Sequence, residues 1–321
     1  PLRQAYPDTI KVKFGYEQNA LEQQFVADSG EARTALSLDT QIVTNIATVV
    51  DNAKYKDRFI GFDSPYVRYL AINMDKVTDV NERKAIQCAI DLKTVLLAAG
   101  GSTSGVYTSS LIPSFVKPAY RSFTMCGRDV KKNPEAQLAL AKGYLAKATT
   151  KKMDLTLAYR DKGVEPARAA AAQQGLEAAG FNVTMVKLPR AGYYTAIGKR
   201  GTPEEYDIVQ TSWGFDWPYA SGIVYALLDG STMTPTDSHS NYSRQNVPAL
   251  QAMFRQADKT INSAAQEKLL GDIDQKAVQD YAAVVPTYVE TSNFMFGSKL
   301  GGVQADYGYG TLSPLYAYVK K

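Results

Sequence analysis

The sequence is poor in the side chains on which most metal and acid–base chemistry depends. Its 321 residues include one histidine, His239, and two cysteines, Cys88 and Cys126. A lone histidine cannot build a histidine-rich zinc site, and both cysteines lie far from it in the sequence. As a general base His239 would need a nucleophile and an orienting partner, and its neighbouring serines are too close in sequence to form a convincing pair. The sequence therefore predicts no catalytic residue, no metal site and no cofactor.

Long apolar runs are also missing. No stretch approaches the roughly 18 apolar residues that span a bilayer. Residues 1–4 lack the charged, apolar and small-residue regions of a secretion signal. We expect that any such signal has been removed or lies upstream.

Two further absences exclude function classes. The glycine-rich segment 100–105 lacks the Gly-Lys-Ser/Thr ending of a phosphate loop and follows a predicted helix, so it is interpreted as a helix stop and turn. The net charge is +4, but the basic residues are scattered. Their densest group, Lys147 with Lys151 and Lys152, has no interleaved aromatic residues that would stack bases. Nucleic-acid binding is not expected.

The two cysteines leave two interpretations open. Cys88 lies on the apolar side of a predicted helix, where a thiol is usually a small buried hydrophobe. Cys126 lies in a predicted loop. A disulfide between them would suit an oxidising compartment, but the sequence cannot establish the pairing.

Helix and strand patterns alternate along the chain, which predicts an α/β fold. We expect one helix from a cap at Asp79, with Glu82 in a capping box, to the stop at Gly100. A second helix is expected over 133–148. A β-α-β unit is predicted from strand 153–159, helix 165–179 closed by Gly180, and strand 181–188.

The last third of the chain continues this alternation. Residues 206–213 are predicted to form a strand that runs into an irregular loop. Two helices are expected next, one capped by Asn246 and the other by Ser263. Residues 284–296 are predicted to form a strand.

Two segments carry a resemblance to a known family. The first is 69–73 (YLAIN), followed by 79–86 (DVNERKAI) and 89–91 (AID). The second is Tyr206-Asp207, followed after five residues by 213–218 (WGFDWP). In this order and spacing they resemble the family 5 extracellular solute-binding proteins, the oligopeptide, dipeptide and nickel binders of ABC importers. The similarity covers essentially the whole chain.

The resemblance implies an α/β, type II periplasmic-binding-protein-like fold of two lobes. Lobe two would be complete, at 69–289. Lobe one would be only partly represented, by 1–68 and by the C-terminal return 290–321. Because half a core seldom folds alone, we expect the missing N-terminal half of the same protein to be a partner, as a separate chain or a segment lost to proteolysis.

The family likeness also implies a function. The protein would be an extracytoplasmic peptide-binding protein, a lipoprotein anchored through the missing segment, that closes around a peptide in an interlobe cleft and delivers it to an ABC transporter permease. It would not be an enzyme. The alternatives left open are the same fold with a non-peptide solute (an oligosaccharide, an opine-like conjugate or a metal chelate) and a regulatory or scaffolding paralogue that does not serve transport.

The matching stretch implies a set of ligand contacts. Backbone groups of Ser212, Trp213 and Gly214 would hold the peptide main chain, and glycine would permit close approach. Asp216 matches the acidic residue that pairs with the ligand's terminal amine, a role that favours a cationic amine over a sugar. The alternative for Asp216 is a cap in the turn before Pro218.

Further contacts are implied more loosely. Trp213 and Trp217 would wall side-chain pockets, and Tyr193 matches an aromatic residue at the pocket edge; core packing is the alternative for each. Arg200 falls near a carboxylate-binding arginine of some peptide binders, and a solvated surface arginine is its alternative. Gln210 stands where some relatives carry a basic residue.

Overall fold

The computed structural model describes residues 6–38 and 41–320. The chain divides into two compact units. Unit 1 comprises residues 1–65, 100–105 and 290–321, and unit 2 comprises 66–99 and 106–289. Two long strands, β1 (Phe59–Ile72) and β6 (Val284–Met295), contribute residues to both units. Among the described residues, no helix is both long and apolar enough to cross a membrane.

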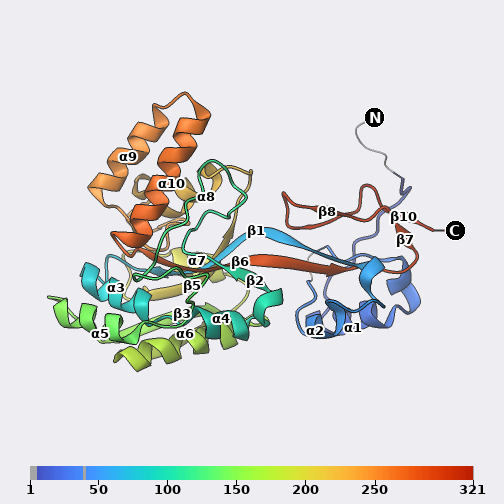
Figure 1. Ribbon diagram of the computed structural model, residues 1–321, viewed down its shortest axis with the longest axis horizontal. Helices are drawn as coiled ribbons and strands as arrows, with labels where there is room; N and C mark the ends of the chain where they lie inside the picture. The colour runs from blue at the N-terminus through green and yellow to red at the C-terminus, as the bar shows by residue number, and fades with distance from the viewer. Residues whose placement is uncertain (1–5, 39–40, 321) are drawn as a thin grey trace. The chain divides into compact units, whose positions relative to one another are not determined.

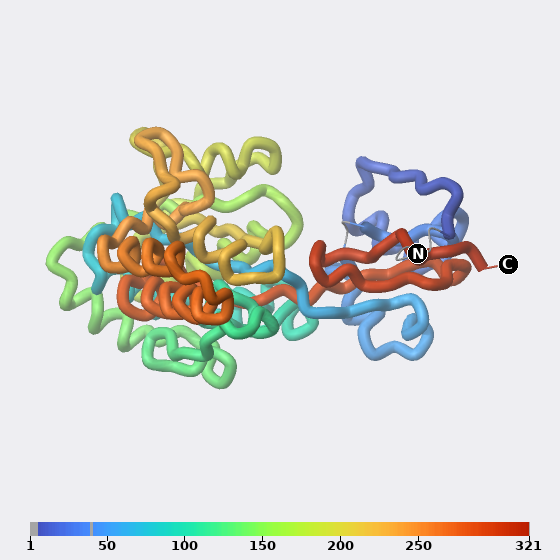
Figure 2. The backbone as a smooth tube through the Cα atoms, turned by 90° about the horizontal axis from the view of Figure 1, so that it is seen from above, coloured from blue at the N-terminus to red at the C-terminus, as the bar shows by residue number. Residues whose placement is uncertain are grey.

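Unit 1 is built from short elements around two small apolar clusters. Its N-terminal part folds into short helices, and the C-terminal segment forms two-stranded sheets that fold back along them (Figure 2). Backbone hydrogen bonds from Phe296 to Arg58 and from Lys299 to Arg33 fix this return. The elements are α1 (Gln18–Ala27), η1 (Gly30–Thr34), α2 (Ile46–Val49), η2 (Lys56–Arg58), η3 (Gly101–Thr103), β7 (Leu300–Gly301), β8 (Gln304–Asp306), β9 (Thr311–Ser313) and β10 (Tyr318–Val319).

Unit 2 is organised by a six-stranded sheet in the order β2-β6-β1-β5-β3-β4. The remaining strands are β2 (Gly105–Tyr107), β3 (Asp154–Arg160), β4 (Asn182–Leu188) and β5 (Ile208–Gly214). β3 pairs in parallel with both β4 and β5, whereas β5 pairs antiparallel with β1. The mixed sheet with helices confirms the predicted α/β class.

Helices form two layers around this sheet. In Figure 1 the mutually packed helices α3 to α6 lie below the sheet of unit 2, and α8 to α10 lie above it. The core between the layers is continuous and rich in Ile, Leu, Val and Ala. The helices are α3 (Val80–Ala89), α4 (Leu92–Ala98), α5 (Leu138–Lys147), α6 (Glu165–Ala179), α7 (Tyr193–Gly198), α8 (Ser221–Leu228), η4 (Gly230–Thr232), α9 (Pro248–Asp258) and α10 (Ser263–Gln279).

The predicted β-α-β unit is confirmed. α6 spans Glu165–Ala179 and ends at Gly180, whose φ of 111° is the left-handed conformation that glycine adopts easily. The Asp79 cap is confirmed too, since its carboxylate accepts from the backbone N–H groups of Asn81 and Glu82. Glu82 does not complete a capping box; its carboxylate accepts from the backbone N–H of Lys152, 2.7 Å away.

The prediction of one helix from Asp79 to Gly100 is wrong, because the chain breaks at Ile90-Asp91. Asp91 caps a new helix, accepting from Thr94 N at 2.8 Å and Ala136 N at 3.1 Å. Residues 133–137, which include the Ala136 that contacts Asp91, are not helical, so α5 begins at Leu138 and not at residue 133. Contacts between distant segments therefore decide both boundaries.

Two predicted caps are also wrong. α9 begins at Pro248 after Val247, and Asn246 makes no cap. α10 is capped by Asn262, whose side chain accepts from the N–H of Ala265, and not by Ser263. In both cases the helix begins within two residues of the predicted position.

The two cysteines form a disulfide. Cys88 is the second-last residue of α3, Cys126 lies in a loop, and their Cα atoms are 5.4 Å apart. The bond ties that loop to the helix layer. Of the two interpretations that the sequence leaves open, the structure shows the paired one.

Candidate functional site

The candidate site lies where β5 runs on past its parallel neighbour. β3 pairs with β5 only at Ile208 and Val209, while β1 continues alongside β5 as far as Gly214. Within the described chain, no strand therefore pairs with 210–214 on the side away from β1. In α/β sheets, ligands bind at the carboxyl ends of strands, beside such a change of neighbour.

The turn after β5 is held at both ends. Phe215 is buried and meets the ring of Phe115 edge-on, with centroids 6.0 Å apart. Trp213 Nε1 donates to the carbonyl of Gly222 at 2.8 Å. At the far end the Ala220 N–H donates to the Glu267 carboxylate at 2.8 Å. Packing and hydrogen bonds therefore hold both ends of segment 216–219.

These intervening residues face solvent. Asp216 is exposed, and Trp217 and Tyr219 are 50% and 51% exposed. Trp217 Nε1 donates to Ser221 Oγ at 2.9 Å, which orients the indole ring. The turn therefore combines a solvent-facing carboxylate with two half-exposed aromatic rings, a surface suited to a cation with an apolar body.

The ring of Tyr66 leaves no room for a side chain at position 214. A Cβ on Gly214 would lie 2.6 Å from the ring of Tyr66, its partner on β1. The Tyr66 ring thus occupies the space over Gly214 on that face of the sheet. The main chain of a ligand can therefore approach along the edge of β5, where Ser212 and Trp213 are half-buried.

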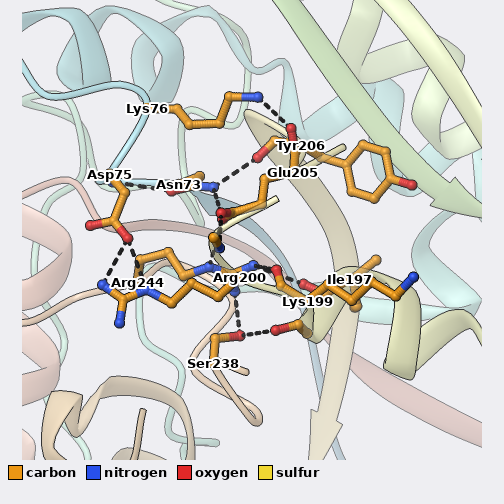
Figure 3. Close-up of polar contacts among 12 residues, drawn as sticks. Asn73, Asp75, Lys76, Ile197, Lys199, Arg200, Glu205, Tyr206, Ser238 and Arg244 are labelled. Carbon is orange, nitrogen blue, oxygen red and sulfur yellow. Dashed lines mark hydrogen bonds and ion pairs between the residues drawn. The ribbon is translucent and has the colours of Figure 1, made fainter. Parts of the chain in front are cut away.

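Tyr193 and Arg200 have partners inside the protein. Tyr193 is 2% exposed, and its hydroxyl donates to the Gln210 carbonyl at 2.5 Å. Burial raises the pKa of Tyr193. Arg200 pairs with Asp75, with its Nη2 3.0 Å from Oδ2, and belongs to the polar cluster of Figure 3. The structure does not bring these two side chains into the exposed turn.

A buried polar cluster beside β5 is not anticipated from the sequence. Glu165, at the start of α6, lies 2.9 Å from Arg68 Nη1 and 2.8 Å from Arg168 Nη1. Gln210 Nε2 donates to the same carboxylate at 2.8 Å. Burial raises the pKa of Glu165, but Arg168, Arg68, the Gln210 amide and Lys162 together hold it below its ordinary value. The carboxylate is therefore charged and neutralised locally.

The contacts with Glu165 also explain why the polar side chain of Gln210 is buried. Its side chain is buried, and it donates to the Glu165 backbone carbonyl at 3.0 Å as well as to the carboxylate. A single sequence gives little sign of this, because Arg68 and Glu165 lie 97 positions apart. The one signal in the sequence is that Arg68 is a charged residue within an otherwise largely apolar strand.

A comparison with family models decides the family. The model for bacterial extracellular solute-binding proteins, family 5 Middle, matches residues 2–235. The chain belongs to this family. The recognition made from the two sequence segments is confirmed.

Solved structures of this family share the fold. Clavulanic acid biosynthesis oligopeptide binding protein 2 matches with a TM-score of 0.82 at 18% identity, covering 96% of this chain and 56% of that protein. A dipeptide binding protein from Pseudoalteromonas sp. SM9913, in complex with Met-Leu, gives 0.70 at 16% identity over 95% and 57%. The oligopeptide-binding protein AppA from Bacillus subtilis, in complex with a nonapeptide, gives 0.71 at 15% identity over 95% and 59%.

The chain thus spans a little over half the length of these relatives. A comparison with curated proteins finds no match. The similarity to periplasmic-binding-protein-like structures confirms the predicted fold class, with only part of the two-lobe fold represented in this chain.

Proposed function

We propose that this protein captures short peptides outside the cytoplasm and delivers them to the permease of an ABC importer. The observation that carries the proposal is the exposed Asp216 carboxylate, placed just after the open edge of β5. The peptide ligands named for its structural relatives support it. It acts as a binding protein and not as an enzyme.

The open edge of β5 suits a peptide because main-chain groups are the same in every peptide. A strand-like ligand that lies along 212–214 gains hydrogen bonds that do not depend on its side chains. Asp216 then fixes the end of the ligand by pairing with its terminal amine. The rings of Trp217 and Tyr219 add apolar contact for the first side chain.

We further propose that a partner segment outside this chain, the N-terminal half of the same protein, completes lobe one and the ligand cleft, since the structural relatives are nearly twice as long. Unit 1 exposes a run of apolar side chains, of which Ile10 is 48%, Val12 53% and Phe14 88% exposed. Such a run suits a surface that is covered in the whole protein. Protein isolated from its native source is expected to have a mass well above 35.1 kDa or to co-purify with a second chain. A single, monomeric 35.1 kDa species would contradict this partner.

An oligosaccharide is a second candidate ligand. The observation that favours it is the pair of half-exposed rings of Trp217 and Tyr219, since sugars stack on such rings. A sugar has no use for the charge of Asp216, so the experiment below separates the two ligands.

Asp216→Asn is expected to weaken peptides with a free amine selectively. The substitution keeps the shape of the side chain and removes its charge, so the loss for trialanine should be about tenfold to a hundredfold. N-acetylated trialanine should be nearly unaffected. Isothermal titration calorimetry of both peptides against both proteins measures the difference.

The matched control is Asp280→Asn. Asp280 is a similarly exposed aspartate whose charge pairs with Lys276 at the end of α10. Its loss should change neither affinity. Equal weakening of both peptides by Asp216→Asn would show that Asp216 does not pair with the amine.

A further inference from the structure

β4 forms an open edge of the unit 2 sheet. In the part of the chain that the structure describes, it is the last strand of this sheet and has β3 as its only neighbour. Val183, Thr184 and Val186 are β-branched, a residue type that favours the extended backbone of a strand. An edge of this kind pairs readily with a strand of another chain unless it is covered or blunted.

The backbone groups of alternate β4 residues point to the open side. Asn182 N donates to the Met153 carbonyl at 2.8 Å, and the Leu188 carbonyl accepts from Asp161 N at 2.8 Å, so the even-numbered residues of β4 face β3. The backbone groups of 183, 185 and 187 must point the other way, because successive residues of a strand alternate in direction. β4 therefore presents a row of N–H donors and C=O acceptors at the edge of the sheet.

Opposite charges lie at the two ends of this edge. Near its start, the Gln173 amide on α6 donates both to the Val183 carbonyl at 3.2 Å and to the exposed Glu177 carboxylate at 2.8 Å. Glu177 and Val183 also line the same surface hollow. Near its end, Lys187 lies 3.4 Å from Asp161, and their side chains are 60% and 51% exposed. Such an exposed ion pair contributes little, so it holds Lys187 only weakly.

We propose that two copies of this chain form a dimer by pairing their β4 strands antiparallel, about a two-fold axis at Met185. In this register Met185 lies opposite Met185 of the partner subunit, and Val183 lies opposite Lys187 of the partner subunit. These are the residues whose backbone groups point outward, so each pair can exchange both of its N–H···O bonds. The Val183 carbonyl can accept a second hydrogen bond, because its oxygen has two lone pairs.

The charges favour a second copy over an unrelated strand. Opposed residues of an antiparallel pair have Cβ atoms about 4.5–5.5 Å apart, so Lys187 of the partner subunit lies against Val183 and beside Glu177. The two-fold axis repeats this contact at the other end of the strand. A lysine on an edge repels most incoming strands by its burial cost, but here it meets a carboxylate at both ends. The edge is therefore complementary to itself in backbone and in charge.

Lys187→Glu and Glu177→Lys are each expected to weaken the dimer about tenfold, because like charges then meet at both contacts. An equal mixture of the two variants should regain about the wild-type affinity, since each variant supplies the charge that the other needs. Lys93→Glu is the matched control, because Lys93 has 63% exposure and an exposed partner, Glu135, away from β4. Sedimentation equilibrium at a series of protein concentrations, without ligand, measures the dissociation constants.

Met185→Pro tests the backbone contacts. The N–H of Met185 points away from β3, so proline should leave the β3–β4 pairing intact while it removes the central donor of the dimer. We expect this variant to be monomeric, with a thermal melt to verify folding; if it does not fold, the exposed charge variants decide. A wild-type protein that stays monomeric at every concentration overturns the proposal. So does a dimer that the charge reversals leave unchanged or that mixing the two variants does not restore.

Discussion

Asp274→Asn is expected to stabilise the protein by about 4 kcal/mol above pH 7, a large effect for one isosteric substitution. Asp274 is a buried residue of α10. Burial raises its pKa from 3.8 to about 7, because no compensating charge replaces the water that a carboxylate loses. The difference between the two values corresponds to about 4 kcal/mol.

Hydrogen bonds from Ser110 Oγ and Leu111 N lower the pKa of Asp274, but burial outweighs them, and a neutral acid can keep both contacts. Ser110 Oγ lies 2.6 Å from Asp274 Oδ2 and 3.0 Å from the Ile112 carbonyl. One hydroxyl hydrogen cannot serve both acceptors. If the Ser110 hydroxyl donates to Ile112, a protonated Asp274 donates to Ser110, and Asp274 Oδ1 accepts from Leu111 N at 3.1 Å. An asparagine amide supplies the same donor to Ser110 and the same acceptor for Leu111 N, with one further N–H.

The sign of the pH dependence follows from the raised pKa. Below pH 3.8 the group is protonated in both the folded and the unfolded chain, so it has no effect. Between 3.8 and about 7 the unfolded chain has lost this proton while the folded protein keeps it, so the free energy of unfolding falls as pH rises. Above about 7 the full penalty is present and constant. Asparagine has no such dependence.

Urea unfolding at pH 4 and pH 8 measures the effect. The difference in free energy of unfolding between Asp274→Asn and wild type should grow by about 4 kcal/mol from the lower to the higher pH. Asp280→Asn, on the exposed face at the end of the same helix, should shift it by under about 0.5 kcal/mol. A variant less stable than wild type at pH 8 would show that the carboxylate is required there.

Local patterns predicted those parts of the fold that local chemistry determines. The helix Glu165–Ala179 ends at its glycine as expected, and the Asp79 carboxylate caps α3. Each of these features depends on residues within a few positions of one another, which a single sequence displays directly.

Features that depend on distant partners were not predictable in this way. The break between α3 and α4 depends on the hydrogen bond between Asp91 and the backbone N–H of Ala136. The burial of the Gln210 side chain depends on its hydrogen bond to Glu165. Arg200 has the residue type of a ligand anchor, but the structure gives it Asp75 as a partner 125 positions away. Residue type alone cannot separate an arginine that meets a ligand from one that holds loops together.

Arg244 belongs to the second kind, and Arg244→Met is expected to cost about 3–5 kcal/mol of stability. Its side chain is 3% exposed and lies 3.3 Å from the Glu205 carboxylate. Its Nη2 donates to the carbonyls of Ile197 at 3.1 Å and Lys199 at 2.7 Å (Figure 3). Methionine fills similar volume but removes the donor of these carbonyls and the positive charge beside Glu205, which keeps its hydrogen bonds from Asn73 and Gly201.

The comparison with Arg200→Met isolates the effect of burial. Arg200 lies in the same cluster, but its side chain is 27% exposed and that of its partner Asp75 is 45% exposed. Water replaces such a contact, so we expect a loss below about 1 kcal/mol. Thermal melts should place the Arg244 variant roughly 10 °C below wild type and the Arg200 variant within about 3 °C. Equal shifts for the two variants would mean that Arg244 does not hold the loops around Glu205, because a buried donor without a substitute must cost more than an exposed one.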